Sequence, residues 1–166
     1  MQSLTTLQEL IASHPFLDGL DPKFLGFFES CASLRRFSSH QLIFEAGNEA
    51  DHFYLILSGR VVLEAEVSGR GVLSIQTIGA GEALGWSWLF APYQWRFTAL
   101  TAAPTEVVSF GAGYLRQSAE ANADFANELL RRIAKTVIQR LAASRDRLSE
   151  LCSVSEHQLA SPCLRF

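Results

Sequence analysis

The stretch Gly81-Glu82-Ala83-Leu84-Gly85-Trp86-Ser87-Trp88-Leu89 combines a glycine-rich turn with a cluster of aromatic residues, and Arg96 follows it. The two glycines allow the backbone to turn sharply and to approach a ligand closely. A short helix that begins at this turn would direct free N–H groups toward a phosphate. Arg96 could then pair with the same phosphate through two hydrogen bonds. The stretch therefore predicts a turn that can hold an anion.

The chain around this turn, from about residue 34 to 110, consists of short apolar runs separated by glycine-containing breaks. The runs lie at residues 42–44, 53–57, 61–63, 72–75, 97–101 and 106–110. Breaks such as Ser58-Gly59 are typical of hairpin turns, where glycine tolerates a positive φ. Many short strands with such breaks predict an antiparallel roll, sandwich or barrel.

Apolar residues at helical spacing flank this β region on both sides. Residues 4–31 predict two short helices, the second with Asp21 as its N-cap and Pro22 at its first position. Residues 123–151 predict one long helix, and residues 152–166, which have no clear period, predict a tail. The helix is longer than a small β-domain needs for its own cover, so its apolar stripe is expected to contact a second copy of the chain. The predicted dimer interface consists of Leu130, Ile133, Val137 and Leu141.

Composition favours one folded domain over residues 1–151. The chain has 166 residues, of which 48% are hydrophobic, and its formal net charge is -3. A weakly acidic chain gives no electrostatic reason to expect nucleic-acid binding. No apolar run is long enough for a membrane span, the start lacks a secretory signal pattern, and three cysteines without a CxxC pair suit a reducing compartment. We therefore expect a cytoplasmic protein.

Catalytic and metal-binding patterns are absent from the sequence. The four histidines have no paired spacing of the kind that metal-binding β-barrels use; they are His14, His40, His52 and His157. No Gly-x-Ser-x-Gly elbow, Walker loop or His-Glu-x-x-His motif occurs. We therefore expect a protein that is not an enzyme, with no catalytic residue and no metal.

The order of these elements resembles the cyclic nucleotide-binding domain of the Crp/Fnr type, over roughly residues 7–150. The motifs that carry the resemblance are Phe16-Leu17-Asp18-Gly19-Leu20, Gly47 with Asp51, Tyr54-Leu55-Ile56-Leu57-Ser58-Gly59-Arg60-Val61, Gly81-Glu82 with Gly85, Thr105-Glu106-Val107, and Leu141 with Arg145 to Glu150. The resemblance implies an α+β, mainly β fold: a double-stranded β-helix, or jelly-roll-like β-roll, between short N-terminal helices and a long C-terminal helix. It also implies no direct DNA binding, because the family's helix-turn-helix would follow the long helix and the sequence ends there.

The resemblance also assigns roles to the residues of the turn. Gly81 and Glu82 would organise it, and Arg96 stands where the family has the arginine that pairs with the cyclic phosphate. Trp86 stands in place of the glutamate that binds the ribose, and an indole has one donor and no acceptor. The ligand-binding residues implied are Gly85, Trp86, Ser87, Arg96, Phe97 and Thr98.

Two interpretations of the aromatic residues remain open at this stage. In the first, the chain is a non-catalytic regulatory or sensor module that binds cyclic AMP, cyclic GMP or another small anionic ligand and signals through its C-terminal helix, as a homodimer, to a protein partner. In the second, Trp86 and neighbouring aromatics fill the pocket, and the chain is a ligand-free interaction or scaffold domain. Arg96 has a similar alternative, which is an exposed ion pair with a loop carboxylate.

Overall fold

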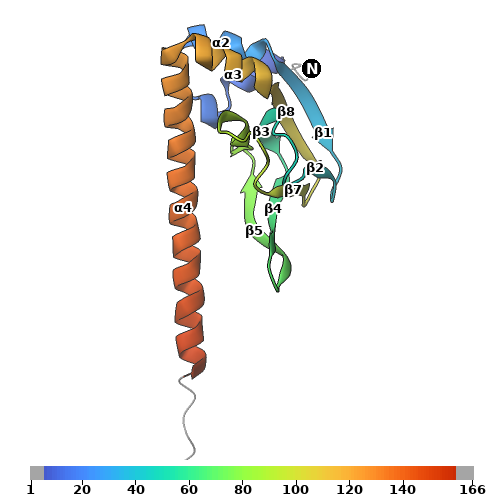
Figure 1. The fold of residues 1–166 in the computed structure, drawn as a ribbon, viewed down its shortest axis with the longest axis vertical. Coiled ribbons are helices and arrows are strands. Elements are labelled where there is room, and N and C mark those ends of the chain that lie inside the picture. The colour runs from blue at the N-terminus through green and yellow to red at the C-terminus, as the bar shows by residue number, and fades with distance from the viewer. Residues whose placement is uncertain (1–5, 160–166) are drawn as a thin grey trace, which may run out of the picture. The chain divides into compact units, whose positions relative to one another are not determined.

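The computed structural model describes the backbone of residues 6–159 and the side chains of residues 6–150. The chain divides into two compact units, one ending at Asn127 and one beginning at Glu128. The first unit contains two antiparallel four-stranded sheets (Figure 1). The first sheet has the order β1 (Ala32–Phe37), β8 (Thr105–Gly111), β3 (His52–Ser58) and β6 (Ala83–Leu84). The second has the order β2 (Leu42–Phe44), β7 (Thr98–Thr101), β4 (Arg60–Val67) and β5 (Gly71–Gly79). The predicted antiparallel β-roll is therefore confirmed.

Strand β3 separates two aromatic clusters, because consecutive residues of a strand point to opposite faces of the sheet. On one face, the ring of Phe53 lies 5.9 Å from that of Phe110 and 6.0 Å from that of Trp88. On the other face, the ring of Tyr54 lies 6.1 Å from that of Phe44 and 6.5 Å from that of Trp95. All six rings are buried. The second cluster lies beside the glycine-rich turn.

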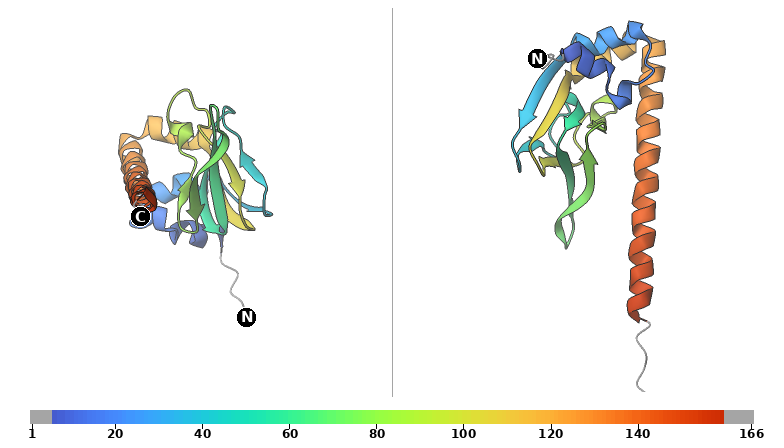
Figure 2. Two further views of the ribbon diagram at one scale, coloured as in Figure 1. Left: turned by 90° about the horizontal axis from the view of Figure 1, so that it is seen from below. Right: turned by 180° about the vertical axis from the view of Figure 1, so that it is seen from behind.

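The N-terminal helices have the capping residues that the sequence predicts. They are α1 (Leu7–Ala12), the 3₁₀ turn η1 (Pro15–Leu17) and α2 (Pro22–Glu29). The Asp21 carboxylate accepts a hydrogen bond from the Lys23 N–H at 3.0 Å, with Pro22 at the first helical position, so the predicted N-cap is confirmed. Figure 2 shows α1, α2 and α3 (Ala112–Ala121) together at one end of the β-roll.

Helix α4 runs from Ala123 to Leu159, beyond the predicted end at residue 151. The prediction of a tail is thus wrong for residues 152–159, where neither glycine nor proline interrupts the helix. Residues 160–166 lie outside the described part of the chain. In the first unit, the ring of Phe125 contacts three phenylalanines of α2 at centroid distances of 4.7 to 5.7 Å, which are Phe24, Phe27 and Phe28.

The second unit is the remainder of α4, where the four residues of the predicted dimer interface lie. The exposed fractions of these residues in the single chain are 42% for Leu130, 3% for Ile133, 40% for Val137 and 70% for Leu141. Their role in an interface stays a prediction. Of the described helices, none has an apolar stretch long enough to span a bilayer.

Candidate functional site

The turn at residues 79–85 is held to strand β3 by backbone hydrogen bonds. Gly81 and Gly85 have φ of +83° and +79°, in the left-handed region that favours glycine. The Gly81 N–H donates to the Ile56 carbonyl at 2.8 Å, and the Ile56 N–H donates to the Glu82 carbonyl at 3.0 Å. The short strand β6 then continues this pairing with β3. The turn is therefore fixed along one edge of the first sheet.

Glu82 closes this turn with its own side chain. One carboxylate oxygen accepts a hydrogen bond from the Gly79 N–H at 2.8 Å. A bond from a backbone N–H to a charged carboxylate is stronger than one between neutral groups. This contact is the geometry that a turn-organising residue requires.

Trp95 lies directly against Gly85. Its indole is 4% exposed and stacks on the ring of Phe44, with centroids 3.8 Å apart and planes 12° apart. A Cβ added to Gly85 would lie 2.7 Å from Cζ3 and 2.9 Å from Cη2 of the indole. The Trp95 ring therefore covers the Cα of Gly85, and glycine is required there both by its φ and by lack of space.

The other tryptophans of the aromatic loop, which we define as residues 86–97, have different surroundings. Trp88 is fully buried against Phe53, and its indole N–H has no hydrogen-bond partner among the described residues. Trp86 precedes the 3₁₀ turn η2 (Ser87–Leu89) and is half-buried, as is Ser87. Trp95 is thus the tryptophan whose ring lies against Gly85, and the roles assigned to Trp86 stay predictions.

The remaining predicted ligand residues lie toward the surface. Arg96 is exposed, and within the described residues it forms neither a hydrogen bond nor an ion pair, so the alternative ion pair with a loop carboxylate is not seen. Phe97 is 39% exposed. Thr98 is half-buried at the start of β7, where its hydroxyl oxygen accepts a hydrogen bond from the Ala46 N–H at 3.1 Å. The structure therefore places Gly85 beside Trp95, and leaves Arg96 available at the surface.

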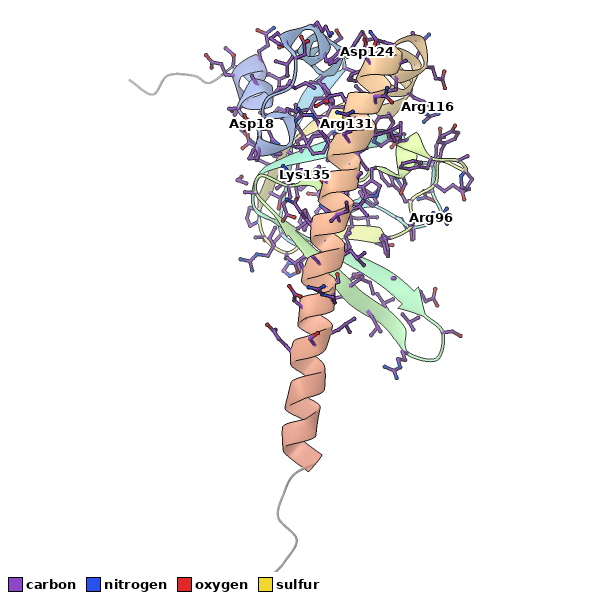
Figure 3. All side chains as sticks on the ribbon, turned by 90° about the vertical axis from the view of Figure 1, so that its left-hand side faces the viewer. Asp18, Arg96, Arg116, Asp124, Arg131 and Lys135 are labelled. Atoms are coloured by element: carbon purple, nitrogen blue, oxygen red, sulfur yellow. The ribbon has the colours of Figure 1, made fainter. Side chains whose placement is uncertain are left out.

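Two contacts from Arg116 to the aromatic loop were not predicted from the sequence. Arg116 projects from α3 (Figure 3) and donates a hydrogen bond from Nε to the Trp88 carbonyl at 3.1 Å. Its guanidinium also lies 4.1 Å from the centroid of the Tyr93 ring, a favourable cation–π geometry. Tyr93 has φ of +58°, which costs a residue with a side chain about 1 to 2 kcal/mol. Arg116 thus holds the loop at a backbone carbonyl and at a strained residue.

Two titratable groups of the first unit have raised pKa values. Burial raises the pKa of Cys31 to about 11 and the pKa of Tyr54 to about 12, so both groups stay protonated at neutral pH. Among the described side chains, no group of three or more His, Cys, Asp or Glu could hold a metal ion.

Comparison with known proteins agrees with the arrangement of strands and turn. A family model described as the cyclic nucleotide-binding domain matches residues 34–122, more than half of the chain. No curated protein matches the sequence.

Solved structures with this fold are distant in sequence. A protein of Geobacter metallireducens GS-15, described as cyclic nucleotide-binding, is 24% identical with a TM-score of 0.74, over 82% of this chain and 98% of that one. A cyclic nucleotide-binding domain from Methylobacillus flagellatus KT is 20% identical with a TM-score of 0.73, over 86% and 83% of the two chains. The c-di-GMP responsive global regulator CLP of Xanthomonas campestris is 20% identical with a TM-score of 0.65, over 86% and 74%. These likenesses show the fold, and the family model shows that this chain belongs to the cyclic nucleotide-binding domain family.

Proposed function

We propose that this chain is a non-catalytic regulatory module in which Trp95 takes the place of a ligand at the glycine-rich turn, and in which α4 carries the output by pairing with a second copy. The observation that carries the proposal is the contact between the Trp95 indole and Gly85, where the added Cβ would meet the ring at 2.7 Å. The module would then adopt a ligand-bound type of packing without a nucleotide.

The cost of displacing Trp95 supports this proposal. An anion that binds at the turn must approach the backbone near Gly85, whose Cα the indole covers. Moving the indole away would remove its stack on Phe44 and expose a buried aromatic surface of about 150–250 Å². At about 25 cal/mol per Å², the displacement costs roughly 4 to 6 kcal/mol, which a ligand must recover through its own contacts. Cyclic AMP and cyclic GMP would therefore bind weakly at most.

A second candidate function is binding of a small anionic ligand after Trp95 has moved. Two observations favour it: the left-handed turn at Gly81 and Gly85 is intact, and Arg96 has no described partner beside it. In that case an aromatic ligand group would replace the indole in the stack on Phe44. Such a ligand would act by shifting the population of the two packings.

Pairing through α4 is supported by the spacing of its exposed apolar residues. These residues follow one another at intervals of seven, four and seven positions, as a coiled-coil seam requires; they are Leu130, Val137, Leu141 and Leu148. At 1.5 Å per residue, a helix of 37 residues extends for about 55 Å, enough for several heptads. Exposed Leu and Val in such a row are typical of an interface.

Titration calorimetry with cyclic AMP and cyclic GMP tests the first part of the proposal. Wild-type protein should give no binding heat at millimolar nucleotide, and Trp95→Ala, which frees the space beside Gly85, should gain measurable binding of a nucleotide or of a simple phosphate. Micromolar binding of either nucleotide by the wild type would refute the ligand-independent form and favour the second candidate.

Light scattering tests the output helix. The wild type should have the mass of two chains, and Val137→Asp with Leu141→Asp should reduce it to one, because two unpaired charges would be buried in the seam. Gln139→Asp, also at an exposed position of α4, is the matched control and should keep the mass of the wild type. A double variant that stays dimeric would exclude this seam.

A further inference from the structure

His14 is a buried imidazole that uses both ring nitrogens within the protein. The residue is 3% exposed and lies between α1 and η1. Its Nδ1 accepts a hydrogen bond from the Phe16 N–H at 3.1 Å. Its Nε2 lies 3.1 Å from the carbonyl oxygen of Ile56, which can only accept, so Nε2 carries the proton.

These two partners require the neutral form of the imidazole. In the neutral ring, Nε2–H donates and Nδ1 accepts, so both contacts are satisfied. A second proton would sit on Nδ1 and face the Phe16 N–H, placing two donors opposite one another without an acceptor. Protonation therefore breaks the contact with Phe16 and leaves a charge in a buried place, which costs free energy.

The same carbonyl that binds His14 also holds the glycine-rich turn. The Ile56 oxygen accepts from the Gly81 N–H at 2.8 Å as well as from His14. The next residue along the chain, Pro15, packs on the same glycine, since a Cβ added to Gly81 would lie 3.3 Å from Pro15 Cγ. Residues 14–15, strand β3 and the turn are therefore joined at one carbonyl.

Other charged and titratable groups also lie on these elements. Glu9 of α1 accepts a hydrogen bond from the Thr6 N–H, and Glu82 of the turn accepts one from the Gly79 N–H. Asp18 is the C-cap of η1. On β3, Tyr54 has its pKa raised to about 12 by burial, and His52, which is 2.9 Å from Asp51, is the other imidazole. Imidazole is the side chain whose ordinary pKa lies between pH 5 and 8, so the variants below compare His14 with His52.

We propose that His14 is a proton-operated latch, which holds the glycine-rich turn against β3 at neutral pH and releases it in acid. The inference concerns the same turn as the proposed function. It rests on that proposal in one respect only, which is that a change at this turn regulates the module. An acid signal would loosen the turn, and with it the packing of Trp95 on Gly85, without any nucleotide. The module would then respond to protons at the place where its relatives have a nucleotide turn.

The direction of the pH effect follows from the burial of His14. Burial lowers the pKa of His14 below its ordinary 6.5, against the opposing effect of the hydrogen bond to Ile56. The released imidazole, exposed to water, takes up a proton with its ordinary pKa. The free-energy difference that favours the latched form is therefore fully present above pH 6.5, and it decreases as the pH falls below that value. Between pH 7.5 and 5.5 the ratio of released to latched form rises by at most about tenfold, which is the limit for a latched imidazole that stays neutral throughout.

Amide hydrogen exchange on the ligand-free protein tests the latch. Protection of the Gly81 and Glu82 amides, corrected for the intrinsic pH dependence of exchange, should fall severalfold, and by at most about tenfold, from pH 7.5 to 5.5 in the wild type. His14→Gln should abolish the fall, because the glutamine amide has a donor group and an acceptor group and does not titrate. His52→Gln, the matched control on β3, should keep it.

Ring nitrogen chemical shifts of wild-type His14 provide a second readout that needs no variant. At pH 7.5 they should report a proton on Nε2 alone, with one titration step below pH 6.5. A proton on Nδ1, protection that does not change with pH, or an equal fall in His14→Gln would each overturn the proposal. Nucleotide binding by the wild type would contradict the proposed function and leave these results unaffected, so the two failures are distinguishable.

Discussion

Replacing Gly85 with alanine measures how tightly Trp95 fills the site. The new Cβ carries two separate costs. A residue with a side chain at φ of +79° loses about 1 to 2 kcal/mol, of which the smaller entropy of the unfolded chain returns about 0.4 to 1 kcal/mol. In addition, the Cβ would stand 2.7 Å from the indole, and relief of such overpacking typically costs about 1 to 3 kcal/mol. The free energy of unfolding should therefore fall by about 2 to 4 kcal/mol.

Gly69 provides the matched control for this substitution. Its φ is +76°, and a Cβ added there would meet nothing within 4 Å. Gly69→Ala should therefore show the backbone cost alone, about 1 kcal/mol. Urea unfolding of both variants, followed by circular dichroism at one protein concentration, measures the difference.

A double-mutant cycle then assigns the extra cost to Trp95. Trp95→Ala alone should cost about 3 to 5 kcal/mol, as removal of a buried aromatic side chain does. In the double variant the overpacking disappears, so the two losses should fall short of additivity by about 1 to 3 kcal/mol. Equal losses for Gly85→Ala and Gly69→Ala, or strict additivity in the cycle, would refute the contact between the indole and Gly85.

Three further predictions concern residues around the site. Glu82→Gln keeps the size of the side chain but removes its charge, so the weaker bond to the Gly79 N–H should lower the free energy of unfolding by about 1 kcal/mol in urea titrations. Arg116→Met keeps the apolar stem but loses the contacts to the Trp88 carbonyl and the Tyr93 ring; hydrogen exchange of the aromatic loop should accelerate several-fold, and unchanged exchange would show that Arg116 does not hold the loop. Burial raises the pKa of Cys31 to about 11, so in a variant whose other two cysteines are replaced by serine, the folded protein should react with a thiol reagent slowly. At pH 8 the reaction should be at least tenfold slower than after unfolding. Equal rates would contradict the burial of Cys31.

The β-roll and the helices could be predicted because their signals are local. The hairpin breaks, the N-cap at Asp21 and the period of α4 each depend on residues close together in the sequence. The end of α4 was missed for a related reason: the apolar period fades after residue 151, but nothing in residues 152–159 breaks a helix. Helix propensity without a stripe is a weak signal in a sequence.

The identity of the tryptophan beside Gly85 could not be predicted, because it depends on the path of the aromatic loop. Trp86 lies one position from Gly85 in the sequence, whereas Trp95 reaches it only after the loop has turned through η2 and returned. The loop returns because its backbone pairs with residues far away in sequence: the Trp95 N–H donates to the Asn48 carbonyl at 2.9 Å. Arg116 and His14 were unpredictable as site residues for the same reason, since their partners are distant backbone carbonyls.

The contact of Phe125 with α2 makes the N-terminal helices part of the folding of α4. An isolated helix gains little stability from propensity alone, and its ends fray unless they dock on other elements. The first turn of α4 docks on Phe24, Phe27 and Phe28. Proteolytic removal of the segment before β1 would therefore also release the first turn of α4, which is distant in the sequence. Helix α2 and the first turn of α4 should accordingly open together, as one cooperative unit.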